Sequence, residues 1–95
     1  MSVYGLFIRE RTIDPAELQI YGQKAGGASA GRTLKPLAIY GKQEVLEGEP
    51  CEGVVILEFP NWEEAKAWYD SPAYTEARAH RQKGADYRVV FVEGM

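Results

Sequence analysis

Residues 54–64 read Val-Val-Ile-Leu-Glu-Phe-Pro-Asn-Trp-Glu-Glu. The first six are mostly β-branched or aromatic, which is typical of a strand, and the proline ends that run. Asn61 and Glu64 have the spacing of a capping box, the pattern that opens many helices. This stretch therefore predicts a strand over residues 54–59 and a helix that begins directly after Asn61.

The chain that follows predicts a second helical piece and a last strand. Ser71 is a typical cap, and Pro72 suits the first position of a helix because its missing N–H needs no partner there. We therefore expect helix from Pro72 to about Gln82, with Gly84 as its end. Residues 87–93 alternate little and are rich in valine, as expected of a final strand.

The N-terminal half predicts a strand, a helix and a further strand. Residues 3–8 are β-branched and aromatic, and residues 14–17 read Asp-Pro-Ala-Glu, which indicates a helix opened by another capping box. Residues 34–40 predict a second strand. Pro36 places that strand at an edge of the sheet, where a missing N–H is tolerated. Residues 43–46 are expected to form a short extension or hairpin arm.

The predicted order is therefore β-α-β-β-α-β, with the second helix broken in two. This order is the split βαβ, or ferredoxin-like, arrangement of α+β proteins. We expect one domain over residues 1–95, built as a four-stranded antiparallel sheet with its helices on one face.

The strands carry apolar side chains on both faces of the predicted sheet. Two helices cover only one face, and an exposed apolar face of this size exceeds what monomers usually tolerate. A homodimer that packs sheet against sheet would cover the other face. Each of three strands carries apolar residues on both sides: Tyr4, Leu6 and Ile8 against Val3 and Phe7; Val55, Leu57 and Phe59 against Val54 and Ile56; and Val90 and Val92 against Val89 and Phe91.

Composition excludes several kinds of partner. The formal charge of −3 argues against nucleic acid and against an anionic membrane surface. The single cysteine, Cys51, cannot form an internal disulfide. The apolar run near the N-terminus is too short for a signal peptide, and no stretch is long enough to span a bilayer. We expect a cytoplasmic protein.

Residues 59–74 read Phe-Pro-Asn-Trp-Glu-Glu-Ala-Lys-Ala-Trp-Tyr-Asp-Ser-Pro-Ala-Tyr, and this run resembles the signature of the family catalogued as domain of unknown function 1330. Residues 44–48, Arg81 and residues 89–94 match it too, whereas residues 25–36 depart from it. The resemblance implies a ferredoxin-like fold assembled as a dimeric α+β barrel. That family has no agreed activity, although its structural relatives include small monooxygenases, muconolactone-type isomerases and haem-dependent chlorite dismutases.

The predicted helix over residues 72–82 holds the candidate site. Tyr74 lies on its apolar stripe, and His80 and Arg81 flank that stripe on opposite sides at helical spacing. Tyr74 and Arg81 are the ligand-binding candidates, since together they would hold a small carboxylate or enolate. His80 is the acid–base candidate because imidazole titrates near neutral pH. Ser71 is a further ligand-binding candidate.

Each candidate also has a purely structural interpretation. His80 lies near a helix C-terminus, where a cation interacts favourably with the helix dipole without any ligand. Arg81 would serve equally as a clamp on a backbone carbonyl or on a partner's carboxylate. Ser71 is first of all a helix cap, and residues 68–69 are aromatic core candidates. Glu58 interrupts an apolar strand and is either a buried acid paired with an arginine such as Arg9 or simply the edge of the sheet face.

The sequence carries no metal-ligand spacing and no phosphate-binding loop. A haem would find only His80 as an obvious ligand, so we expect no cofactor and no metal. Two functions remain. One is a small dimeric protein that binds or transforms a small organic acid or quinone-like molecule. The other is a non-catalytic interaction protein whose dimer is the functional unit.

Overall fold

Four strands pair in the order β2-β3-β1-β4 in the computed structural model, which describes residues 1–95. Every neighbouring pair is antiparallel, so the sheet has β2 and β4 at its edges. This is the ferredoxin-like sheet that the element order predicts. The strands are β1 (Val3–Thr12), β2 (Lys35–Ile39), β3 (Gly53–Phe59) and β4 (Ala85–Glu93).

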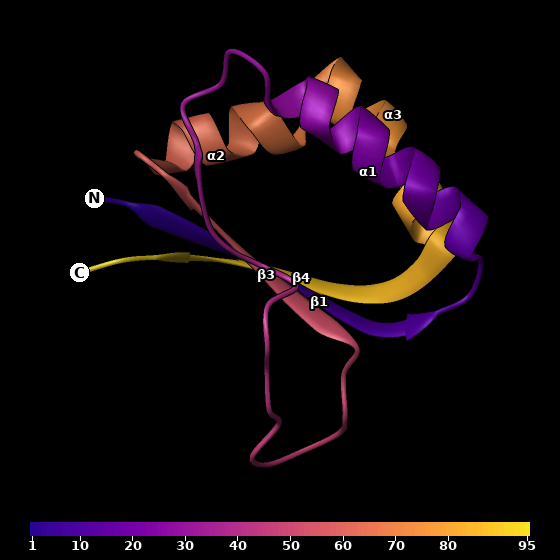
Figure 1. Cartoon of the computed structure of the whole chain (residues 1–95). Helices are drawn as coiled ribbons and strands as arrows, with labels where there is room; N and C mark the ends of the chain where they lie inside the picture. The colour runs from indigo at the N-terminus through magenta and orange to yellow at the C-terminus, as the bar shows by residue number, and fades with distance from the viewer.

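Three helices lie on one face of this sheet (Figure 1). They are α1 (Pro15–Ser29), α2 (Trp62–Tyr69) and α3 (Pro72–Gly84), and α1 lies against α3. The Asn61 side chain caps α2 by accepting a hydrogen bond from the Glu64 N–H at 2.8 Å, as the sequence predicts. The break between α2 and α3 is stabilised by the buried Ser71 hydroxyl, which accepts from the Tyr74 N–H and donates to the Trp68 carbonyl.

The core fills the space between the helices and the sheet, and it is largely aromatic. The rings of Trp68 and Tyr74 stack with centroids 4.0 Å apart, and Phe7 meets Trp68 edge-on at 5.9 Å. These rings tie both halves of the broken helix to the central strand β1. The buried apolar cluster comprises Val3, Phe7, Ala28, Leu57, Phe59, Ala65, Trp68, Tyr74 and Ala77.

Three local predictions are wrong. Residues 43–46 form irregular chain instead of a hairpin arm, and they lie beyond the pairing of β2 with β3, which ends at Ile39 and Val55. Glu17 does not close a capping box, because its carboxylate pairs with His80 on α3. Arg9 does not pair with Glu58. Its Nε lies 3.3 Å from the Glu52 carboxylate at the end of the sheet.

The centre of the sheet face away from the helices is apolar, as the strand pattern predicts, whereas Glu58 beside Tyr4 and Arg88 beside Ile8 place charged groups on the same face. Across its centre, Ile56, Leu6 and Val90 lie opposite one another on three neighbouring strands. Val90 and Val92 are 44% and 48% exposed. The loop between β2 and β3 also leaves the sheet on this side (Figure 1). This far face of the sheet has no covering layer within the chain.

Candidate functional site

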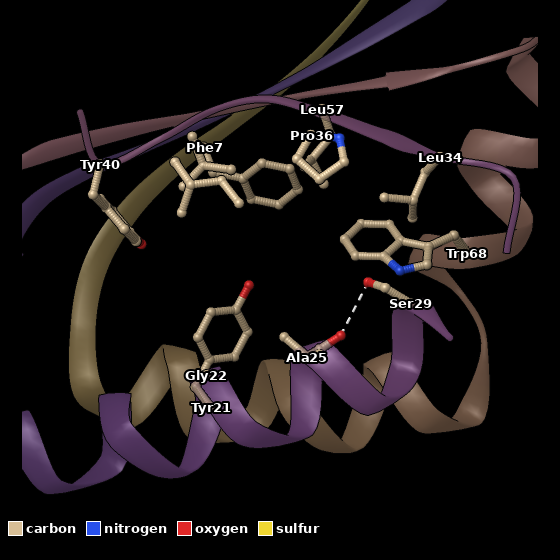
Figure 2. Close-up of a pocket in the computed structure, with 13 residues that line it drawn as sticks. Phe7, Tyr21, Gly22, Ala25, Ser29, Leu34, Pro36, Tyr40, Leu57 and Trp68 are labelled. Atoms are coloured by element: carbon tan, nitrogen blue, oxygen red, sulfur yellow. Dashed lines mark hydrogen bonds between the residues drawn. The ribbon is translucent and has the colours of Figure 1, made fainter. Parts of the chain in front are cut away.

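A cavity of about 320 Å³ lies between α1 and the half of the sheet formed by β2 and β3 (Figure 2). Ile39 and Tyr40 are 59% and 40% exposed, so the cavity opens at the end of β2. None of its thirteen lining residues is charged, and nine are hydrophobic. They are Phe7, Tyr21, Gly22, Ala25, Gly26, Ser29, Leu34, Pro36, Ile39, Tyr40, Val55, Leu57 and Trp68.

Two glycines on α1 leave this space open. Gly22 and Gly26 are one helical turn apart and both line the cavity. A Cβ atom at either position would meet no atom within 4 Å, so a side chain would project into empty space. Each glycine costs a helix interior about 0.8–1 kcal/mol relative to alanine. Gly22 and Gly26 therefore reduce the stability of α1 and enlarge the cavity.

Tyr40 holds a strained position at the cavity mouth. Its φ of 50° lies in the left-handed region, which a bulky side chain rarely adopts. Gly53 makes room for its ring, since a Cβ there would lie 2.5 Å from the Tyr40 ring. The Arg9 guanidinium lies 4.7 Å from the ring centre, and the Tyr40 hydroxyl bonds the Tyr87 hydroxyl at 2.5 Å. Backbone strain that neighbours hold in place is common at functional sites.

Tyr21 places a second hydroxyl at the cavity. Figure 2 shows it pointing from α1 toward the sheet, and it lies 2.8 Å from the hydroxyl of the fully buried Tyr74. Burial raises the pKa of Tyr21, Tyr40 and Tyr74 above the ordinary value of 10.0, against the opposing effect of nearby arginines. All three hydroxyls therefore stay protonated and act as neutral hydrogen-bonding groups.

The indole nitrogen of Trp68 is a buried donor without an acceptor. Trp68 is 2% exposed and lines the cavity, and its Nε1 has no hydrogen-bond partner. In Figure 2 this nitrogen lies on the side of the ring that faces Ser29, whose hydroxyl donates to the Ala25 carbonyl. A buried donor left unpaired costs about 1–3 kcal/mol. An acceptor entering the cavity would remove that cost.

The four site residues predicted from the sequence lie elsewhere, and none lines this cavity. Ser71 is the buried cap of α3, and Tyr74 reaches the cavity only through its bond to Tyr21. His80 Nδ1 lies 2.6 Å from the Glu17 carboxylate and joins α3 to α1. Arg81 is 4% exposed, its guanidinium lies 5.1 Å from the Tyr87 ring centre, and its charge acts on the Tyr74 hydroxyl.

His80 and Arg81 therefore have different partners, and the cavity brings together residues that the sequence alone did not single out. Tyr21 and Tyr40 were missed because each is an isolated aromatic residue far from the family signature. The glycine pair on α1 was the available signal. Glycines spaced by four inside a predicted helix leave a stripe without side chains, which either packs closely against a neighbour or borders a space.

Fold and cavity together define a small ferredoxin-like α+β protein with a mostly apolar pocket under its first helix. The chain belongs to the family described as Domain of unknown function (DUF1330), whose model matches residues 2–95. This confirms the family that the signature over residues 59–74 resembles. A search of curated proteins gave no match.

Several solved structures share this fold. A protein of unknown function from Rhodopseudomonas palustris, RPA0582, is 22% identical, with a TM-score of 0.77 over 99% of this chain and 82% of that one. A dimeric ferredoxin-like protein of unknown function from Thermobifida fusca is 18% identical, with a TM-score of 0.69 over 97% and 90%. SnoaB, a cofactor-independent oxygenase from Streptomyces nogalater, is 7% identical, with a TM-score of 0.62 over 99% and 93%. At these identities the likeness extends to the fold alone. No helix of the chain combines the length and apolar character needed to cross a bilayer.

Proposed function

We propose that the protein binds a small, flat, uncharged aromatic or quinone-like molecule in the cavity under α1, without a cofactor. The unpaired Nε1–H of Trp68 carries this proposal, because Trp68 lines an otherwise apolar space and this buried donor has no acceptor. A carbonyl or phenol oxygen on the ligand would accept that hydrogen bond. The hydroxyls of Tyr21 and Tyr40 would orient the rest of the molecule.

The lining favours a neutral ligand over an organic acid. A carboxylate entering this cavity would lose its hydration and meet no cation, since none of the lining residues is charged. An aromatic ring loses little on leaving water and gains contacts with the apolar walls. Of the two ligand classes expected from the sequence, the cavity therefore supports the quinone-like one.

Binding is the core of the proposal, and any reaction would depend on the ligand's own reactivity. The ionisable groups on the cavity wall are Tyr21 and Tyr40, and burial raises the pKa of both. Neither is a proton acceptor near neutral pH. The likeness to SnoaB, described as a cofactor-independent oxygenase, makes oxidation of a bound phenol the reaction to examine first.

We also propose that two copies pair through the far face of the sheet. The row formed by Ile56, Leu6 and Val90 supports this, as does the dimeric state stated for the T. fusca neighbour. Burying such a face contributes about 25 cal/mol per Å², before the costs of association. If the cavity binds nothing, the dimer surface itself would be the functional feature, which is the non-catalytic alternative.

The test is a calorimetric titration with 2-naphthol as the neutral probe. Gly26→Leu would place a side chain in the cavity where no atom lies within 4 Å of a new Cβ, so the fold should be kept and binding lost. Gly27→Leu is the matched control, because Gly27 is exposed on the same helix and does not line the cavity. Trp68→Phe should weaken binding by about tenfold, the effect of losing one hydrogen bond.

Two results would reject the proposal. One is 2-naphthol binding that Gly26→Leu leaves unchanged, which would place the probe elsewhere. The other is a folded wild-type protein that gives no binding with 2-naphthol or with other neutral phenols and quinones of similar size. Circular dichroism of each variant confirms that the comparison is made between folded proteins.

A further inference from the structure

Arg81 is a buried cation without a counter-charge. Its side chain is 4% exposed, it takes part in no ion pair, and its Nε has no hydrogen-bond partner. The centre of the Tyr87 ring lies 5.1 Å from its guanidinium carbon, and its charge also acts on the neutral hydroxyls of Tyr21 and Tyr74. A stacked ring compensates only part of the cost of removing a guanidinium from water. An acceptor from outside the chain would supply the rest.

An open hollow of about 370 Å³ lies beside Arg81, between the end of α3 and the start of β4. It shares no lining residue with the cavity under α1. Two of its walls are aromatic, since Tyr69 and Tyr87 both line it. Its full lining is Tyr69, Arg81, Gln82, Ala85, Asp86, Tyr87 and Val89.

The charges around this hollow are predominantly positive. The carboxylate of Asp86 is already paired with Arg11, whose terminal nitrogen lies 2.8 Å away. The Arg78 guanidinium lies 4.4 Å from the centre of the ring of Tyr69, one of the residues that line the hollow. Arg81 is therefore the cation that lines this hollow, and the acid that lines it, Asp86, is already paired with Arg11.

We propose that this hollow is a second binding site, which takes the carboxylate of a small aromatic acid. A guanidinium presents its N–H groups in a planar fork that matches a carboxylate, and here the Nε–H is free. The rings of Tyr69 and Tyr87 would hold the flat hydrocarbon part. The site does not depend on the cavity under α1, so the protein would bind a neutral molecule and an acid in separate places.

The test uses benzoate as the probe and benzamide as its uncharged match. In the ¹⁵N-labelled protein, benzoate should shift the Nε–H resonance of Arg81, which is identified by its loss in Arg81→Met. Benzoate at about 100 times its Kd should raise Tm by roughly 10 °C, and benzamide should not. Arg81→Met should abolish the Tm increase while leaving the protein at least as stable without ligand, because it removes an unpaired buried charge. Lys83→Met, which removes an exposed charge from the same helix, should behave as wild type.

Three outcomes would overturn the proposal. If benzamide raised Tm as much as benzoate, the negative charge of the ligand would have no role in binding. A large loss of stability in Arg81→Met, with no benzoate effect in wild type, would make Arg81 a structural clamp. The Nε–H resonance of Arg81 could also lie at the benzoate-bound chemical shift before benzoate is added. If disrupting the far face of the sheet then moved it away from that position, the carboxylate would belong to a second copy of the chain. Gly26→Leu should not alter benzoate binding, which separates this test from that of the cavity.

Discussion

The hydroxyl groups of Tyr21, Tyr40 and Tyr74 show how burial outweighs nearby positive charge in this protein. Arg9 lies over the ring of Tyr40, and the charge of Arg81 acts on Tyr21 and Tyr74. Cations of this kind favour a phenolate, yet burial has the larger effect and raises the pKa of all three tyrosines. These residues therefore donate and accept hydrogen bonds and do not supply charge.

The same shifts predict how stability depends on alkaline pH. Below the ordinary tyrosine pKa of 10.0, the folded and unfolded chains both keep these protons, so these tyrosines do not make the free energy of unfolding depend on pH. Above it, the unfolded chain releases protons that the folded chain retains, so the free energy of unfolding falls as pH rises. Phenolate absorbance and circular dichroism should change together for these tyrosines. Complete titration of all six tyrosines in the folded protein would contradict this prediction.

At the scale of the elements, local signals in the sequence predict where helices begin better than where strands end. The starts of α2 and α3 are correct because Asn61 and Ser71 bond backbone N–H groups within three residues. The predicted first strand stops at residue 8, whereas β1 continues to Thr12. Its last residues are polar, and they are strand because Ala85 and Asp86 of distant β4 pair with them. No local pattern carries that information.

The packing of α1 on α3 gives a test with a matched pair of glycines. A Cβ on Gly84 would lie 2.8 Å from the Leu18 side chain and 3.1 Å from its backbone nitrogen, so Gly84→Ala should force the helices apart and lower Tm. Gly27→Ala meets no atom within 4 Å and should stabilise the protein by about 0.8–1 kcal/mol through helix propensity. Thermal unfolding measures both. Equal changes in Tm for the two substitutions would mean that helix propensity alone, and not the contact of Gly84 with Leu18, determines the change in stability.

For the whole molecule, the sequence predicts the architecture well and the location of the cavity poorly. The strand order follows from the apolar patterning, and the position of β2 at the edge follows from Pro36; both signals are local features of the sequence. The cavity is formed by residues from α1, α2, β1 and both sides of the β2–β3 connection, and their convergence depends on tertiary packing. His80 was a candidate for its imidazole and Arg81 for its guanidinium and its match to the family signature, and none of these properties indicates where a side chain points.

The proposed dimer predicts a specific change in molecular size. Val90 lies opposite Leu6 at the centre of the far face, so Val90→Lys would place a charge in the interface and should convert a dimer to a monomer. Thr75→Lys, on the exposed surface of α3, is the control and should leave the dimer intact. Sedimentation velocity at micromolar concentration measures both. A wild-type protein that sediments as a monomer would refute the dimer.

The edge strand β2 has a consequence for how a molecule reaches the cavity. It is five residues long, pairs only with β3, lacks one N–H at Pro36 and is interrupted by an irregularity between Pro36 and Ala38. The same strand supplies Pro36 and Ile39 to the cavity wall. We therefore expect a molecule that binds in the cavity to enter by loosening β2, which is the shortest strand, while the other three strands stay paired. The bound molecule should then stabilise β2 against local opening. The amide protons of residues 37–39 are therefore expected to exchange with heavy water more slowly in the ligand-bound protein than in the free protein.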